Sequence, residues 1–167
     1  MTAYKYPHGY CGMPCALCTR YRIDGKSRCA GCSHGGYYTE PCKVHHCCME
    51  KGLAQCGLCG EFPCKRLGRM GDFSDLNTGH AKARISKRIA EEGFERWYEE
   101  YAERADTLTA ALERYNNGRM KRYICELFIR EDIEGLRELM HRAEALRGAP
   151  KEKGAGFKNI AREIFGE

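Results

Sequence analysis

Apolar side chains recur at steps of three and four through the second half of the chain, starting near His80. This spacing places them on one face of an amphipathic helix. The first stripe spans Ile85–Tyr115, and Gly93 is the point at which it would divide into two helices. The turn sequence NNG at residues 116–118 predicts its end.

A second stripe spans Met120–Ala143 and is divided by Asp132, a residue type that caps helix N-termini. We therefore expect a helical bundle or hairpin over residues 69–147. The composition of residues 148–156 predicts a flexible linker. Residues 157–167 predict a short amphipathic helix that packs back on the chain, with docking to a partner protein as the alternative. Its apolar positions are Phe157, Ile160, Ala161, Ile164 and Phe165.

Residues 1–68 follow a different pattern, without any sustained apolar periodicity. They contain ten Val, Ile, Leu, Met or Phe residues and ten glycines. Such a segment buries too little apolar surface to offset its loss of chain entropy on folding, unless a cross-link such as a bound metal ion stabilises it. We expect a loop-rich module with little regular structure, followed by helices, so that the protein is mostly α-helical.

We expect cysteines to provide this cross-link, because eleven of the twelve in the chain fall within residues 11–64. The N-terminus lacks the pattern of a secretory signal, and no run approaches eighteen apolar residues. We therefore expect a cytoplasmic protein with no membrane segment. Thiols stay reduced in the cytosol, so dense cysteines there indicate metal ligands rather than disulfides.

The first group of cysteines contains two C-x2-C knuckles, Cys15/Cys18 and Cys29/Cys32, separated by ten residues, with Cys11 ahead of them. Each knuckle can direct two sulfurs to one ion, and two knuckles complete the tetrahedron that zinc prefers. Zinc is the expected metal because it suits closed four-cysteine sites and is redox-inert. An iron-sulfur cluster, in an electron carrier or a redox enzyme component, is the alternative, since it uses the same thiolates.

The second group has one clear knuckle, Cys56/Cys59. Its two other ligands remain open among the other cysteines of the group, Cys42, Cys47, Cys48 and Cys64, and the histidines His45 and His46. His45 and His46 are also within reach in the sequence, in a second-shell or surface role if they are not ligands. With one ion for each group, we expect about two zinc ions per chain. The candidate metal ligands are Cys11, Cys15, Cys18, Cys29, Cys32, Cys42, Cys47, Cys48, Cys56, Cys59 and Cys64.

Other chemistry is less compatible with these residues. The spacing C-x3-C-x2-C over residues 11–18 is that of radical SAM enzymes, but Leu17 replaces their usual aromatic residue and 167 residues are too few for their barrel. A free thiol nucleophile at Cys11 or Cys64 is an alternative to supernumerary metal ligation. Cys125 is expected to be a buried core thiol. We find no phosphate-binding loop or hydrolase motif.

Charge is uneven along the chain. Residues 1–68 hold nine Lys/Arg and four Asp/Glu, a balance of +5, whereas the remainder holds nineteen of each. A basic segment raises the hypothesis of nucleic-acid binding, with Tyr21 available for stacking. Four thiolates around Zn²⁺ carry a net charge of −2, however, so two such sites explain the excess without nucleic acid.

Five stretches, CGMPCALC, CAGC, CKVHHCCMEKG, CGLCGEFPCKRL and EEGFERWYEE, resemble in order and spacing a cysteine-rich prokaryotic family, domain of unknown function 3795. The resemblance covers about residues 11–100 and implies a metal-binding protein, with zinc as the metal and no assigned activity. Two positions depart from the family pattern. Thr39 stands where members often have cysteine, and Cys48 stands where they have alanine, which implies that Cys48 replaces the missing sulfur.

Taken together, the sequence predicts a metal-binding module of unknown biological role that acts as a binding or adaptor module rather than as an enzyme. The sequence leaves the partner unknown; it is compatible with a protein partner, and nucleic acid is not expected. No set of catalytic side chains stands out beside the cysteines.

Overall fold

The computed structural model describes residues 4–68 and 81–166, and these residues form helices and no strand. The chain forms two compact units, Met1–Ala102 and Glu103–Glu167. Residues 69–80, with which the expected helical region begins, lie outside the described residues, as do residues 1–3 and 167. No helix of the described residues is both long and apolar enough to cross a lipid bilayer.

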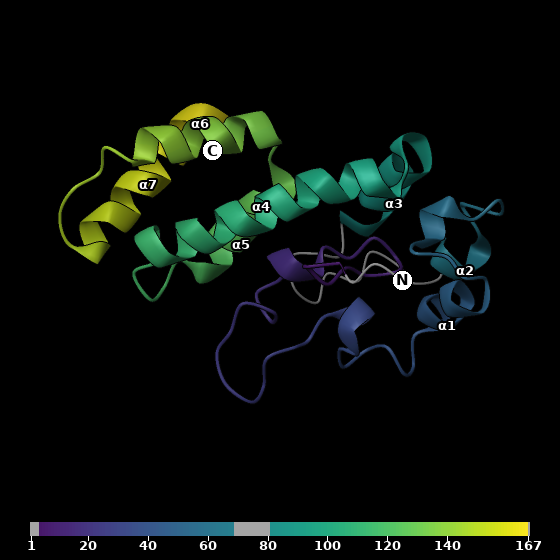
Figure 1. Cartoon of the computed structure of the whole chain (residues 1–167). Helices are drawn as coiled ribbons and strands as arrows, with labels where there is room; N and C mark the ends of the chain where they lie inside the picture. Colours follow the sequence, from purple (N-terminus) through teal and green to yellow (C-terminus); the bar gives the residue numbers. More distant parts are fainter. Residues whose placement is uncertain (1–3, 69–80, 167) are drawn as a thin grey trace. The chain divides into compact units, whose positions relative to one another are not determined.

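The cysteine-rich segment contains only short helices joined by irregular loops (Figure 1). This confirms the expected order of a segment with little regular structure followed by a helical region. Glycine and cysteine are too frequent here, and apolar residues too few, for a long amphipathic helix. The helices are η1 (Cys15–Leu17), η2 (Cys32–His34), α1 (Lys43–Glu50), η3 (Cys56–Leu58) and α2 (Lys65–Gly68).

Helices α3 (Ala81–Glu92) and α4 (Phe94–Tyr115) follow, and Gly93 divides them as the sequence predicted. Gly93 has a φ of 87°, a conformation that glycine adopts without steric cost. Its backbone N–H donates to Ile89 O at 2.9 Å, which closes the last turn of α3. The boundary between the two compact units falls inside α4.

The first unit extends well past residue 68, because tyrosines of α4 bind the N-terminal backbone. The Tyr98 hydroxyl accepts a hydrogen bond from the Tyr6 backbone N–H at 2.7 Å. The Tyr101 hydroxyl accepts from Ala16 N–H at 2.7 Å and donates to Pro7 O at 2.5 Å. These bonds join residues more than 80 positions apart, which the local sequence pattern does not reveal.

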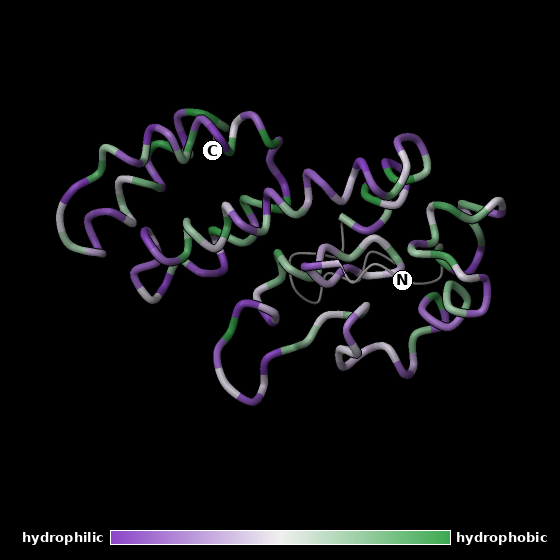
Figure 2. The backbone as a smooth tube through the Cα atoms, viewed as in Figure 1, coloured by the Kyte–Doolittle hydropathy of each residue, from purple (hydrophilic) through white to green (hydrophobic). Residues whose placement is uncertain are grey.

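The second unit contains the end of α4 and helices α5 (Lys121–Arg130), α6 (Ile133–Ala143) and α7 (Pro150–Phe165). Hydrophobic and hydrophilic residues alternate along these helices, as the sequence pattern required (Figure 2). Asp132 caps α6 as predicted, since its Oδ1 accepts from Gly135 N–H at 2.7 Å. The fully buried side chains of this unit include Leu108, Ile124, Leu127, Phe128, Leu136, Leu139 and Phe157.

The expected linker at residues 148–156 is helical from Pro150 onward, so the prediction of a short helix over 157–167 is corrected. Proline is favourable at the first position of a helix, where its missing N–H costs no hydrogen bond. The Glu152 side chain accepts a hydrogen bond from Ala149 N–H at 2.9 Å, which caps the N-terminus of α7. The expectation that this helix packs on the same chain is confirmed, because Phe157 stacks on Tyr115 at 4.7 Å between ring centroids.

Candidate metal centre

The two knuckles of the first cysteine group meet through Cys15 and Cys32. Cys15 begins η1, and Cys18 closes that turn with a backbone N–H bond to Cys15 O at 3.1 Å. Cys32 begins η2, and its backbone N–H donates to Cys15 Sγ at 3.5 Å. Cys29 Sγ accepts from Gly31 N–H at 3.4 Å. N–H donors therefore point at two of the four sulfurs, as they do in metal knuckles.

Cys15 and Cys32 differ in how readily they ionise. The Cys15 thiol donates a hydrogen bond to the Cys32 sulfur, which raises the pKa of Cys15 well above its usual value, and burial raises it further. The same hydrogen bond lowers the pKa of Cys32. Cys32 is thus the member of the pair that forms the thiolate first, and a thiolate is the form that binds metal.

Five thiols of the second cysteine group line a pocket of about 440 Å³. Three separate segments supply its thiols: helix α1, the η3 turn and the residue directly before α2. Apolar side chains of Val44, Leu53, Phe62 and Leu67 complete its wall. The thiols that line it are Cys47, Cys48, Cys56, Cys59 and Cys64.

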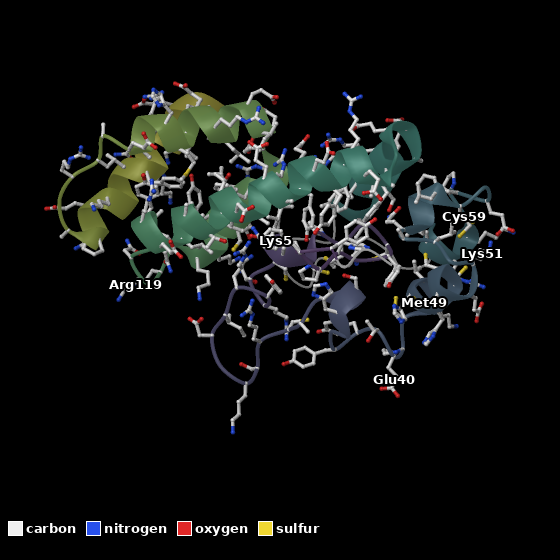
Figure 3. All side chains as sticks on the ribbon, viewed as in Figure 1. Lys5, Glu40, Met49, Lys51, Cys59 and Arg119 are labelled. Carbon is white, nitrogen blue, oxygen red and sulfur yellow. The ribbon has the colours of Figure 1, made fainter. Side chains whose placement is uncertain are left out.

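Cationic side chains accompany the thiols of this pocket. Lys51 Nζ donates to Cys59 Sγ at 3.4 Å and pairs with Glu61 at 3.1 Å, and Figure 3 shows Lys51 beside Cys59. Lys65 and Arg66 also line the pocket, directly after Cys64 in the sequence. Positive charge next to sulfur favours the thiolate over the thiol. Nothing in the sequence singles out Lys51, because its contact with Cys59 depends on the loop between α1 and η3.

Cys11 and Cys48 lie in a small apolar core with Val44 rather than at a surface. Cys11 is 6% exposed and Cys48 is 1% exposed. Burial raises the pKa of each thiol to about 12. This buried environment favours a packed thiol over a reactive nucleophile at Cys11. Cys125 is fully buried in α5, as expected of a core thiol.

Cys42 and the adjacent histidines have structural contacts. Cys42 caps α1, since its Sγ accepts from His45 N–H at 3.4 Å. The His45 ring packs edge-on against Tyr10 at 4.9 Å between centroids. His46 Nε2 contacts Glu40 O at 2.6 Å, outside the thiol pocket. Neither histidine lines that pocket.

His8 is 3% exposed and lies among Phe94, Tyr98 and Tyr10. Its Nε2 contacts Ala54 O at 3.1 Å, and its buried Nδ1 has no hydrogen-bond partner within the described part of the chain. Desolvation lowers the pKa of His8 to about 4. A ring that donates from Nε2 and stays neutral fits this environment.

Two buried polar side chains, Gln55 and Ser86, lie next to Cys56 of the second cysteine group. Gln55 and Ser86 are both 0% exposed, and Gln55 Nε2 donates to Ser86 Oγ at 2.7 Å and to Cys56 Sγ at 3.6 Å. Burial raises the pKa of Cys56 to about 11, while the contact with Ser86 opposes that increase. Sequence reasoning overlooked both residues, since a glutamine in a loop and a serine in a helix carry no signal of burial.

The donor set fits a thiophilic ion in its chemistry, because the pocket gathers five sulfurs with nearby cations. The positions are not those of a closed ligand sphere. Within residues 4–68 and 81–166, no three His, Cys, Asp or Glu side chains are close enough together to hold a metal ion. No cysteine within residues 4–68 and 81–166 takes part in a disulfide bond. Five of the candidate ligands thus line one pocket, and their role as metal ligands stays a prediction.

Residues 8–69 match the family described as "Protein of unknown function (DUF3795)". The match agrees with the family resemblance seen in the motifs and stops before α3 and α4, so it covers the cysteine-rich segment alone. Neither a search of curated proteins nor a search of solved structures gave a match.

Proposed function

We propose that the DUF3795 domain at residues 8–69 is a metal-binding module that holds about two zinc ions through cysteine thiolates. The observation that carries this proposal is the pocket in which three segments of unit 1 bring five thiols together. Thiolate ligands select zinc or iron-sulfur clusters over hard cations. Lys51, Lys65 and Arg66 support the proposal, since they would balance the negative charge of a four-thiolate site.

For the first ion, the ligands that we propose are Cys15, Cys18, Cys29 and Cys32. Their two knuckles already share the contact between Cys15 and Cys32. Cys11 is a fifth thiol near them in sequence, and its place in the apolar core with Val44 favours a packing role. This assignment uses each knuckle as a pair, as structural zinc sites do.

For the second ion, the proposed ligands are Cys47, Cys56, Cys59 and Cys64, which all line the pocket. Cys48 follows Cys47 on α1 and also lines the pocket, but it is 1% exposed, whereas Cys47 is only half-buried. Cys48 belongs to the apolar core, and Cys42 serves as the cap of α1. Both of these thiols are therefore outside the proposed ligand set.

A zinc ion held by four thiolates would supply folding free energy and would offer no open coordination position for a substrate. We therefore propose a binding or adaptor role for the module rather than catalysis. The residues of this chain would hold the ion, neutralise its thiolates and cover it with the apolar wall of the pocket.

The test is the metal content of protein purified without oxygen, measured for the wild type and for Cys→Ser variants. We expect about two zinc per chain in the wild type, and one fewer in Cys59→Ser. Cys125→Ala, which removes a thiol far from both groups in sequence, is the matched control and should keep both ions. Metal-free wild-type protein would contradict the proposal, and iron with acid-labile sulfide would replace zinc by the iron-sulfur alternative.

A further inference from the structure

Gln55 and Ser86 form a hydrogen-bond network in which each side-chain polar atom donates to or accepts from an identified partner. The Ser86 hydroxyl donates its one hydrogen to Cys11 O at 3.1 Å. Gln55 Nε2 has two hydrogens, of which one goes to Ser86 Oγ and the other to Cys56 Sγ. Gln55 Oε1 accepts from Gly57 N–H. A rotated amide would face Gly57 N–H with its own NH₂ group, so this network fixes the direction of the Gln55 donor.

The donors available to Cys56 change when it becomes a thiolate. Cys56 Sγ lies 3.8 Å from Ser86 Oγ, and a protonated thiol can donate its hydrogen there. A metal-bound sulfur has no hydrogen to donate and accepts instead. Because Ser86 gives its hydrogen to Cys11 O, Gln55 Nε2 is the side-chain donor that the described part of the chain aims at the thiolate.

Two glycines let helix α3 approach this network closely. A side chain at Gly12 would collide with Lys82 O and would place its Cβ 2.6 Å from Ser86 Oγ. A side chain at Gly57 would collide with Ser86 O and lie 2.7 Å from Gln55 Oε1. Real Cβ atoms essentially never come so near other atoms. The close contact between α3 and the η3 turn therefore requires glycine at positions 12 and 57.

We infer that Gln55 and Ser86 are positioning residues for Cys56 as a metal ligand: Gln55 donates an N–H···S bond to the thiolate, and Ser86 holds the amide in place. This inference rests on the proposed metal site and adds to it a residue of α3. Ser86 lies beyond residues 8–69, so the matched domain does not contain its whole site. Such outer contacts typically alter metal affinity by about 10- to 100-fold.

The decisive variant is Gln55→Glu, which keeps the size of the side chain and an oxygen for Gly57 N–H. Its carboxylate offers no N–H to Cys56 and adds negative charge beside the thiolate. We expect zinc affinity at one of the two sites to fall about 10- to 100-fold in a competition with a chromophoric chelator. The thiolate-to-metal band of cobalt substituted at that site should shift, while the other site keeps its wild-type band and affinity.

Asn159→Asp is the matched control, because it makes the same amide-to-acid change at an exposed position of α7. It should leave both affinities unchanged. Ser86→Ala removes the support of the amide and keeps its N–H, so we expect a smaller loss at the same site. If Gln55→Glu does not fold, the zinc affinity of Ser86→Ala provides the test: a loss at one site supports the inference, and wild-type affinity at both sites contradicts it.

Three outcomes would overturn the inference. Wild-type affinity and an unchanged cobalt band in both variants would show that the network has no effect on the metal. A lowered unfolding temperature with both affinities intact would reduce Gln55 and Ser86 to structural residues. If the wild-type protein binds neither zinc nor cobalt, the proposed function and this inference are both contradicted. The first two outcomes differ from this one, because in them the wild-type protein still binds metal.

Discussion

The two units of this protein bury different kinds of side chain. In the second unit, the buried residues are mainly aliphatic and aromatic, such as Leu136, Phe128 and Phe157. In the first unit, fully or nearly buried positions include Gln55, Ser86 and His8, and tyrosine hydroxyls bind backbone atoms. The comparison shows that the second unit relies on an apolar core, whereas the first unit adds buried polar contacts to apolar side chains such as Ile89 and Trp97. Polar contacts of this kind depend on geometry far more than apolar contacts do.

Metal removal should separate the two units most strongly. Chelation under reducing conditions should expose backbone amides of residues 11–64 to hydrogen exchange and leave α5, α6 and α7 protected. The reason is that structural zinc contributes on the order of 10 kcal/mol to the folding of small modules, while the second unit has its own apolar core. Mass spectrometry of exchanged peptides measures this. Equal protection of residues 11–64 before and after complete metal removal would refute it.

Removal of one apolar side chain should weaken the second unit. Phe157→Ala should lower the free energy of unfolding of this unit by about 3–5 kcal/mol, because it leaves a cavity beside Tyr115. Urea titration followed by far-UV circular dichroism measures the loss. Asn159→Ala, at an exposed position of the same helix, is the control. A loss of the same size in both variants would show that helix stability, rather than packing, is affected.

Acid should weaken the first unit through His8. Its native pKa of about 4 is below the usual 6.5, so the fold favours the neutral ring. The stability from this difference is complete above pH 6.5 and declines as the pH falls toward 4, by up to about 3 kcal/mol. His8→Phe should flatten that part of the pH dependence, measured by urea titration at several pH values. His141→Gln, at an exposed position, should keep the wild-type slope.

A smaller effect should follow from the loss of one buried hydroxyl. Tyr101→Phe should lower the free energy of unfolding by about 2 kcal/mol, because it leaves Ala16 N–H and Pro7 O without their bonds. Tyr37→Phe is the matched control, since its hydroxyl also binds a backbone oxygen but the side chain is 53% exposed. Equal effects of the two substitutions would show that burial of the hydroxyl is not the cause.

The helices of the second unit were largely predictable because their signals are local. Apolar spacing placed α5 and α6, and Asp132 marked the start of α6. The start of α7 was misplaced, since the glycines and lysines of residues 148–156 indicated a linker. Packing of Phe157 and the cap by Glu152 favour a helix there. Tertiary contacts can thus override weak local propensity.

The candidate site was predictable only in part. Spacing identified the knuckles Cys15/Cys18, Cys29/Cys32 and Cys56/Cys59 as ligand pairs, and their metal content stays a prediction. Spacing did not distinguish Cys47 from Cys48, because adjacent residues differ only in the direction that a helix gives them. Nor did it single out Gln55, whose partners lie in another segment.

By itself, the sequence determined that the chain has a cysteine-rich part of low regularity and a helical part, since composition and periodicity act over a few neighbouring residues. Tertiary structure alone decided which thiols share a pocket, which lie in an apolar core, and that α3 and α4 complete the first unit. The physical reason is distance along the chain. Hydrogen bonds such as that between Tyr101 and Ala16 exist only after the backbone has brought remote residues together.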